Sequence, residues 1–311
     1  MRRTLSYQVK EEDVAHTVGG LVNFLLKDCL HLTGREVSRA KFLPDGIMAD
    51  GVQVTVKQRL RAGQILTVCL EDTEGMESRV AAREGALTIL YEDEDIVFVD
   101  KPAGVVVHPS HGHFYDSVGN YLAYYYEQQG MDVICRVIGR LDKDTSGVLL
   151  FAKNQAAAAR MTAQKQNGKS SRTYYALVQG HMPSKKGEIH ASLERVPDDL
   201  MLQRVSEHGL PAHTTYEVVQ EFKDYSLLSV KISTGRTHQI RVHMASVGHP
   251  LLGDPLYGTL SYADPEQKQI PTDGTALRIQ RAALHSAEVI CQQPFTGEII
   301  KITSPLPEDM R

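Results

Sequence analysis

An acidic side chain in a small polar turn is the first feature of this sequence that could do chemistry. Asp142 lies in the segment GRLDKDTSGVLLFAKN (139–154), shortly before Thr145, Ser146 and Gly147. Those small residues predict a tight turn ahead of the apolar run VLLFA, which has the composition of a buried strand. A carboxylate at such a junction can be presented to a cleft as an acid, a base or a nucleophile.

The same stretch is rich in positive charge. Between Gly139 and Arg172 there are two acidic residues, Asp142 and Asp144, and seven basic ones: Arg140, Lys143, Lys153, Arg160, Lys165, Lys169 and Arg172. A carboxylate among basic residues suits an enzyme that works on a phosphodiester polymer, because the cations attract the backbone and the acid meets the target. Composition alone favours a simpler interpretation, in which the loop aspartate only caps a turn.

A second polar cluster follows in the segment TGRTHQIRVHMASVGHPLLGDPLYG (234–258). It places Arg236, His238, Arg241 and His243 within eight positions. Polar and apolar residues alternate here, which predicts a strand with Arg241 and His243 on the same face. Such a strand would present two polar side chains to one side of a sheet.

The elements that would carry these clusters are mainly strands. Alternating patterns predict strands within 89–102, 173–180, 214–222, 226–233 and 298–306, and helical patterns occupy 118–129 and 154–167. Strand patterns follow one another with only turns between them, which favours antiparallel pairing over repeated βαβ units. We therefore expect an α+β fold, with a mixed, mainly antiparallel β-sheet and helices.

A smaller α+β domain is predicted before it. Val18, Leu21, Val22, Leu25 and Leu26 have helical spacing, and a second helix is predicted at 34–42. Two strand-like segments follow at 46–56 and 64–70, the first with a turn at Asp50–Gly51. Residues 71–85 lack apolar periodicity, which indicates a linker. The expected division is a domain over 1–75, a linker over 76–86 and a larger domain over 87–311.

Basic residues gather in the smaller domain: Arg35, Arg39, Lys41, Lys57, Arg59 and Arg61. Its helix, basic helix and hairpin resemble the small RNA-binding module first known from ribosomal protein S-four, in a degenerate form. That resemblance implies RNA contacts at the second helix, for which Arg39 is the candidate. The alternative is a small α+β cap with a solvated, charged face.

Several ordered motifs together resemble the RluA-type pseudouridine synthases. These motifs are EDEDIVFVDKPAGVVVHP (92–109), GRLDKDTSGVLLFAK (139–153), RTYYALVQG (172–180), AHTTYEV (212–218), the Arg-Thr-His-Gln-Ile-Arg block (236–241) and ALHSAEV (283–289). The resemblance covers about residues 87 to 304, which is nearly all of the larger domain. It implies the pseudouridine synthase fold and an isomerase (an intramolecular transferase) that acts on RNA.

The resemblance also assigns roles to individual residues. Asp142 matches the family's essential aspartate, Tyr174 its active-site tyrosine and Arg241 the arginine expected to pair with the aspartate. Arg140 matches an arginine implicated in displacing the target base from its stack. Further RNA contacts are expected from Lys143, Arg172, Arg236 and His238. The sequence departs from the family pattern at Gly139, where many relatives have histidine, and at Arg172, where others have lysine.

The implied reaction breaks the bond between uracil and ribose, turns the base and rejoins it through carbon 5. No atoms are gained or lost, so no cofactor is expected. Asp142 can attack the anomeric carbon or stabilise the positive charge that develops there, and the Arg241 guanidinium would favour its ionised form. Tyr174 can cover the extruded base and move a proton, while Arg140 can fill the gap that the base leaves.

Composition and isolated motifs exclude several other classes of protein. No apolar stretch is long enough to cross a bilayer, the chain start lacks a signal peptide, and the four cysteines form no CxxC pair. The histidines of HPSHGH (His108, His111 and His113) have Pro and Gly neighbours that suit a loop better than a zinc site. We therefore expect a cytoplasmic monomer without a metal, whose partner is RNA.

The RNA target stays open between two kinds. Ribosomal RNA of the large subunit is favoured, because an amino-terminal module of this type commonly accompanies such enzymes; transfer RNA is the alternative. A third possibility is an RNA-binding protein of ribosome assembly that uses the fold without catalysis. Loss of Asp142 would be its mark, and Asp142 is present.

Overall fold

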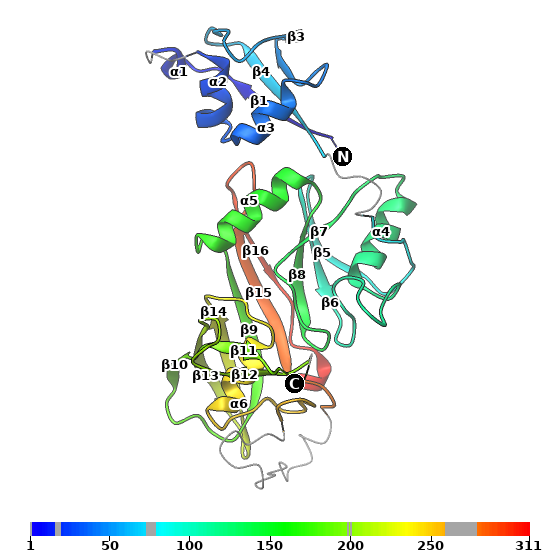
Figure 1. Cartoon of the computed structure of the whole chain (residues 1–311), viewed down its shortest axis with the longest axis vertical. Helices are drawn as coiled ribbons and strands as arrows, with labels where there is room; N and C mark the ends of the chain where they lie inside the picture. The colour runs from blue at the N-terminus through cyan, green and yellow to red at the C-terminus, as the bar shows by residue number, and fades with distance from the viewer. Residues whose placement is uncertain (1, 16–19, 73–78, 198, 200, 259–278) are drawn as a thin grey trace.

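The computed structural model describes residues 2–15, 20–72, 79–197, 199, 201–258 and 279–311, which form a four-stranded sheet, a ten-stranded sheet and a two-stranded ribbon (Figure 1). The four-stranded sheet has the order β1 (Arg2–Gln8), β4 (Ile65–Glu71), β2 (Ile47–Ala49), β3 (Val52–Gln53). The first strand of the ten-stranded sheet in the sequence is β5 (Thr88–Glu92). No helix of the described residues is long and apolar enough to span a membrane.

The amino-terminal part combines the four-stranded sheet with short helices. Its strands are β1 (Arg2–Gln8), β2 (Ile47–Ala49), β3 (Val52–Gln53) and β4 (Ile65–Glu71), and its helices are α1 (Glu11–Ala15), α2 (Val22–Phe24), a π-helical turn (Leu25–Cys29) and α3 (Gly34–Ala40). The hairpin turn at Asp50–Gly51 and the second helix lie where the sequence predicts them. The side chain of Thr33 caps α3 in a capping box with Glu36.

Two features of this part differ from the sequence prediction. The expected helical run around Leu21–Leu26 divides into a short α-helix and a π-helical turn, and Val18 lies outside the described residues. Strand β1, which no pattern predicted, pairs antiparallel with β4 along its whole length. Leu5 on β1 and Val68 on β4 are paired and both buried, so this strand completes the small core.

The larger sheet has ten strands in the order β10-β13-β14-β9-β15-β8-β6-β5, with β16 on β15 and β7 on β8. Its neighbours pair antiparallel except β8 and β15, which pair parallel, so the expected α+β class is confirmed. The strands are β5 (Thr88–Glu92), β6 (Ile96–Lys101), β7 (Arg136–Ile138), β8 (Ser146–Ala152), β9 (Ser171–Gln179), β10 (Lys186–His190), β13 (His213–Glu221), β14 (Tyr225–Ile232), β15 (Leu284–Gln292) and β16 (Ile299–Thr303). A separate ribbon joins β11 (Leu193–Arg195) to β12 (Gln203–Val205).

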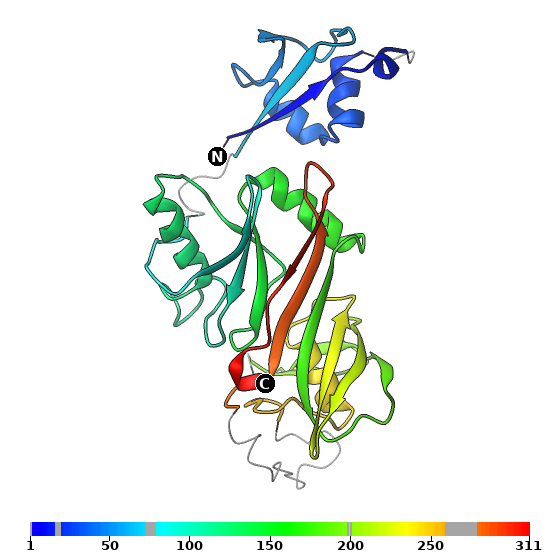
Figure 2. The ribbon, with the colours of Figure 1, turned by 180° about the vertical axis from the view of Figure 1, so that it is seen from behind.

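Helices cover both faces of this sheet (Figures 1 and 2). They are α4 (Val118–Gln128), α5 (Gln155–Gln166) and α6 (Gln239–Ser246), followed near the carboxyl end by a 3-10 helix (Glu308–Met310). Along β6 the side chains alternate, so that Val97 packs in one core with Leu122 of α4 and Phe98 in the other with Met161 of α5. Strand β8 is buried at every position because both of its faces are covered.

Specific polar contacts join the two parts of the chain. Arg160 of α5 bonds Glu36 of α3 at 2.6 Å, and Arg3 of β1 bonds the fully buried carboxylate of Asp95 at 2.8 Å. Asp72, just after β4, accepts from the backbone of Gln155 at 2.8 Å. Residues 79–87, between the two sheets, form neither helix nor strand.

Candidate active site

A cavity of about 410 Å³ opens between the loop before β8, strand β9 and the segment that leads into α6. A volume of this size can hold a nucleotide-sized ligand. Most of the predicted site residues line it: Arg140, Asp142, Arg172, Tyr174, Arg236, His238 and Arg241. Residues separated by about a hundred positions in the sequence are thus brought to one place.

The backbone just after Asp142 is fixed by basic side chains from other parts of the fold. Lys101, at the end of β6 and 1% exposed, donates to the carbonyl oxygen of Lys143 at 2.7 Å. Arg281, just before β15, donates to the carbonyl oxygen of Asp144 at 3.0 Å. Burial lowers the pKa of Lys101 to about 7, although the charges of Asp144 and Asp142 oppose this change. The loop is therefore held by its own carbonyl groups, which leaves the Asp142 side chain facing the cavity.

Arg241 stands between two carboxylates. Its Nε and Nη2 atoms each bond Asp254 at 2.7 Å, and its Nη1 atom lies 3.9 Å from Oδ2 of Asp142. Burial disfavours the charged guanidinium, but the hydrogen bonds and charge of Asp254, with a contribution from Asp142, raise the pKa of Arg241 above its ordinary value. The bidentate pair of Arg241 is thus made with Asp254, and Asp142, the partner that the resemblance implies, keeps only the longer contact.

The segment that carries Arg241 is a helix, so the prediction of a strand was wrong. Residues two apart on an α-helix point in nearly opposite directions, because each residue turns the chain by about 100°. Arg241 accordingly lines the cavity, whereas His243 bonds the Thr214 hydroxyl at 2.9 Å and the Ala191 carbonyl at 3.0 Å. His243 is fully buried and is not among the residues that line the cavity.

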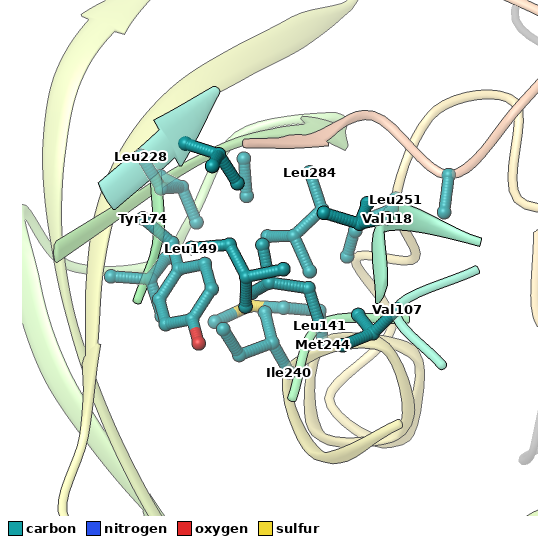
Figure 3. Packing of buried hydrophobic residues seen from close by; sticks show 14 of the residues in the cluster. Val107, Val118, Leu141, Leu149, Tyr174, Leu228, Ile240, Met244, Leu251 and Leu284 are labelled. Carbon is teal, nitrogen blue, oxygen red and sulfur yellow. The ribbon is translucent and has the colours of Figure 1, made fainter. Parts of the chain in front are cut away.

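Tyr174 lies on β9 with its ring in the main hydrophobic core. It is 5% exposed and belongs to the same cluster as Leu141 and Ile240 (Figure 3). Its hydroxyl oxygen lies 3.5 Å from Nη1 of Arg172, two residues earlier on the same face of the strand. A rigid ring that lines the cavity and carries a hydroxyl group is positioned both to cover a base and to exchange a proton.

Gly139 is surrounded by two cations. A side chain at this position would begin 3.2 Å from Nζ of Lys165 and 3.7 Å from the Arg172 guanidinium. Arg172 also makes long contacts of 3.4 to 3.5 Å to the carbonyl groups of Ile138 and Gly139. Burial, followed by the charge of Arg172, lowers the pKa of Lys165. The space that a histidine would need is therefore occupied by positive groups in this chain.

His238 adopts a left-handed backbone conformation, with φ of 55°, at the start of α6. Its Nδ1 atom lies 2.9 Å from the Tyr257 hydroxyl, which fixes the ring at the cavity wall. Burial lowers the pKa of His238. The positive charge of Arg241 lowers this pKa further, whereas the charge of Asp142 acts to raise it. The preceding loop is held by buried Gln239, whose Oε1 atom accepts from Thr234 at 2.8 Å and from the backbone of Arg236 at 3.1 Å.

The cavity is electropositive around one acid. Among the described residues that line it, Asp142 is the single carboxylate, and the lysines and arginines are Arg140, Lys165, Arg172, Arg236 and Arg241. A cavity lined in this way can attract a polyanion such as a phosphate backbone and presents one carboxylate among its cations.

Some of the basic residues that the sequence analysis singled out lie away from the cavity. Lys153 is buried and bonds Glu92 at 2.6 Å, and Arg160 is used by the contact with α3. Lys143 is exposed outside the cavity lining, with its Nζ atom 3.3 Å from Nε2 of His113. Arg39 lies on α3, where it donates to the Gln155 side chain at 3.2 Å. These four residues lie outside the cavity, although Lys143 and Arg39 are both exposed.

Sequence reasoning missed three residues of the site: Lys101, Lys165 and Asp254. Lys101 and Asp254 lie inside quoted motifs, DKPAG and LLGDPLYG, but only the folded chain brings them to Asp142 and Arg241. Lys165 is one of the seven basic residues between Gly139 and Arg172, and its helical neighbours give no reason to single it out. A buried cation in an otherwise apolar strand, as in IVFVDK, is the signal that could have identified Lys101.

Comparisons with known proteins agree with this site. Residues 95–246 match the family model described as RNA pseudouridylate synthase. "Ribosomal large subunit pseudouridine synthase D" of Nitrosomonas europaea is 38% identical over 85% of this chain and 74% of its own length. "Uncharacterized RNA pseudouridine synthase YjbO" of Bacillus subtilis is 34% identical over 90% of this chain and 94% of its own.

A solved structure is also similar. The protein described as "Human RNA Pseudouridylate Synthase Domain Containing 1" has a TM-score of 0.55 and 25% identity, and the match covers 72% of this chain and 86% of the human one. The matched family region contains the Asp142 loop, Tyr174 and Arg241, which the fold brings together at one cavity. The chain therefore belongs to the RNA pseudouridine synthases, and to the RluA type that its motifs resemble.

Proposed function

We propose that this enzyme isomerises specific uridines of large-subunit ribosomal RNA to pseudouridine, with Asp142 as the reacting carboxylate. The relatives from Nitrosomonas europaea and Escherichia coli are named ribosomal large subunit pseudouridine synthase D, at 38% and 34% identity. The observation that carries the proposal is the position of Asp142, a lone carboxylate on the wall of an electropositive cavity. We further expect a cytoplasmic enzyme that works as a monomer.

The isomerisation breaks one bond to the anomeric carbon of the ribose and forms another. Asp142 attacks the anomeric carbon or stabilises its developing positive charge, and the bonding electrons leave with N1 of the uracil. The base turns within the cavity and carbon 5 bonds the anomeric carbon; where Asp142 has bonded that carbon, its carboxylate leaves in the same step. The proton displaced from carbon 5 is then removed, and N1 ends protonated. Tyr174 is our candidate for this proton transfer, because its hydroxyl lies beside Arg172 at the cavity wall.

The surrounding cations would bind and hold the RNA. Arg140 is exposed at the cavity rim, next but one to Asp142, where a planar guanidinium can replace the extruded base in its stack. Arg172, Arg236 and His238 line the same wall and can contact phosphate or the base. Lys143, outside the lining, is suited to the backbone of flanking nucleotides.

We further propose that the amino-terminal part, over residues 1–75, is an S-four-like RNA-docking module, joined by a linker over 76–86 to the catalytic domain over 87–311. All six of its clustered basic residues are exposed: Arg35, Arg39, Lys41, Lys57, Arg59 and Arg61. Phe42, just beyond the basic helix, is 88% exposed, and an exposed aromatic ring among cations suits an unpaired base.

Modification mapping in cells tests the proposed reaction and its target together. Total RNA from a deletion strain, treated with carbodiimide and primer-extended, should lose one or more pseudouridine stops in large-subunit ribosomal RNA. Complementation with the Asp142→Asn variant should leave the stops absent. The Asp45→Asn variant, which alters an exposed carboxylate outside the cavity lining, should restore them. Stops lost only from transfer RNA would overturn the ribosomal target, and stops restored by Asp142→Asn would overturn the chemistry.

A further inference from the structure

Three side chains suited to a metal ion converge on the outer strands of the large sheet, away from Asp142. Glu188 and His190 are two residues apart on the edge strand β10, so they project from the same face. His213 of β13 is the direct cross-strand partner of His190. The register of the sheet therefore places one carboxylate and two imidazoles together, although the sequence separates them by more than twenty residues.

The ligand atoms already lie near the spacing of a coordination shell. Oε2 of Glu188 is 2.9 Å from Nε2 of His190 and 3.2 Å from Nε2 of His213, and the imidazole rings stack with centroids 4.0 Å apart. All three ligand atoms lie within 4.8 Å of one another. Nitrogen and oxygen ligands of a tetrahedral Zn²⁺ ion, bound at about 2.0–2.2 Å, are separated by about 3.4 Å. Small side-chain rotations would bring both nitrogens and the oxygen onto one ion.

We propose that Glu188, His190 and His213 form a binding site for a divalent transition-metal ion of the Zn²⁺ type, completed by water. Two imidazoles and a carboxylate are ligands that this class of ion accepts with a fourth position open. The side chains of Glu188 and His190 are 60% and 66% exposed, so an ion can enter from solvent without unfolding the sheet.

A second set of contacts orients His213. Its Nδ1 atom lies 3.1 Å from the Ser233 hydroxyl, the kind of outer contact that fixes the tautomer of a metal-binding histidine. Its backbone N–H donates to the Thr234 hydroxyl at 3.1 Å. Ser233 and Thr234 also line the catalytic cavity, so a bound ion would fix His213 beside the loop that leads to His238 and α6. The site is separate from the reacting carboxylate but adjoins the RNA-binding wall.

Zinc binding to the purified full-length enzyme tests this proposal without any RNA. Tag-free protein is stripped with a chelator, exchanged into metal-free buffer near pH 7.5 and titrated with ZnCl₂ in a calorimeter. We expect about one equivalent of zinc to bind, and the His190→Ala variant to lose this site. His208→Ala, which removes another exposed histidine outside the cluster, is the matched control and should bind as the parent does. Circular dichroism checks that each variant is folded.

One further measurement separates a built site from loose association. The Ser233→Ala variant should weaken zinc affinity by about tenfold, because outer contacts of a ligand histidine contribute that much. Equal zinc binding by the parent and His190→Ala, or no binding by the parent, would overturn the proposal and leave the cluster as a surface ion pair. Either result is independent of whether Asp142 catalyses the isomerisation.

Discussion

Asp142 keeps its carboxylate oxygens available because its guanidinium neighbour is already matched. Asp254 takes the two short hydrogen bonds of Arg241 at 2.7 Å, and Asp142 has the single contact of 3.9 Å. A carboxylate held in a bidentate pair would have to break two strong hydrogen bonds before it reacted. The shared guanidinium instead places positive charge near Asp142 without occupying its oxygens.

The Asp254 carboxylate is expected to stabilise the fold through its pair with Arg241. The Asp254→Ala substitution should lower the free energy of unfolding by about 3–5 kcal/mol, because it leaves a buried guanidinium without its partner. The measurement is urea unfolding followed by circular dichroism. Asp45→Ala, which removes an exposed partner of Arg2 at 3.3 Å, is the control and should cost less than about 1 kcal/mol. Equal losses in the two variants would show that Arg241 does not depend on Asp254.

Arg140 is expected to assist the extrusion of the target base. Replacing it with alanine should lower kcat/KM on a structured RNA on the order of tenfold, since extruding a stacked base costs a few kcal/mol and the guanidinium offsets part of that cost. Single-turnover rates at saturating enzyme should change less than the apparent affinity. An unstructured oligonucleotide with the same uridine is the control substrate, and the substitution should affect it much less. An equal loss on both substrates would assign Arg140 to the chemistry instead.

At the scale of elements, periodicity predicted most of the large sheet but not α6. Runs such as IVFVDK alternate between two buried faces, and the structure has strands there. The segment QIRVHMAS also alternates, with Ile240 and Val242 suggesting a strand, yet it forms a helix that is buried nearly all round. Three polar residues of this helix can be buried because each has a hydrogen-bond partner. Gln239 accepts from Thr234 in the preceding loop, Arg241 donates to Asp254, and His243 bonds the Thr214 hydroxyl. Local alternation carries no information about such partners.

Long-range pairing explains the other failures of sequence reasoning. The candidates Asp142, Tyr174 and Arg241 followed from ordered motifs, but their distances depend on β9, β8 and α6 meeting across the sheet. The parallel pair of β8 and β15 is one such junction, where Ser146 and Gly147 face His285 and Ser286. No spacing within either strand specifies that register.

This junction gives an element-scale prediction. Gly147 has φ of 103°, and a Cβ there would lie 2.2 Å from the carbonyl oxygen of Ser286. Gly147→Ala should therefore destabilise the protein by about 3 kcal/mol or more, through backbone strain and overpacking next to the Asp142 loop. Gly130→Ala is the control, because that glycine has φ of 67° but no atom near its missing Cβ, and it should cost about 1–2 kcal/mol. Thermal unfolding of the two variants under one condition makes the comparison, and similar losses would contradict it.

At the scale of the whole molecule, charge is distributed unevenly. The chain has a net charge of −4, yet the described residues that line its cavity include five lysines and arginines and one carboxylate. One of the seven basic residues between Gly139 and Arg172 lies away from the cavity: Arg160 bonds Glu36 at 2.6 Å and so joins the two parts of the chain. The global charge therefore excludes only a generic polyanion-binding protein, and RNA affinity has to come from local fields that are visible once the chain is folded.

Buried histidines link the stability of the whole molecule to pH. Burial lowers the pKa values of His108, His243 and His285 below their ordinary value of 6.5. The unfolded chain then binds protons more readily than the folded one as the pH falls through 6.5, so acidification favours unfolding. The stability that these neutral histidines contribute is fully present above that pH and is lost below it.

We therefore expect the free energy of unfolding to be lower at about pH 5.5 than at about pH 7.5, by up to about 1.4 kcal/mol for each unit by which a histidine pKa is depressed. Urea unfolding at both pH values measures the difference. His285 bonds Ser146 at 3.0 Å and the Ser304 carbonyl at 3.2 Å, so His285→Gln should fold with reduced stability but show a smaller pH dependence. His208→Ala, at an exposed histidine, should leave the dependence unchanged. Equal stability of the parent protein at the two pH values would contradict this account, because it would mean that the buried imidazoles take up protons in the folded state as readily as in water.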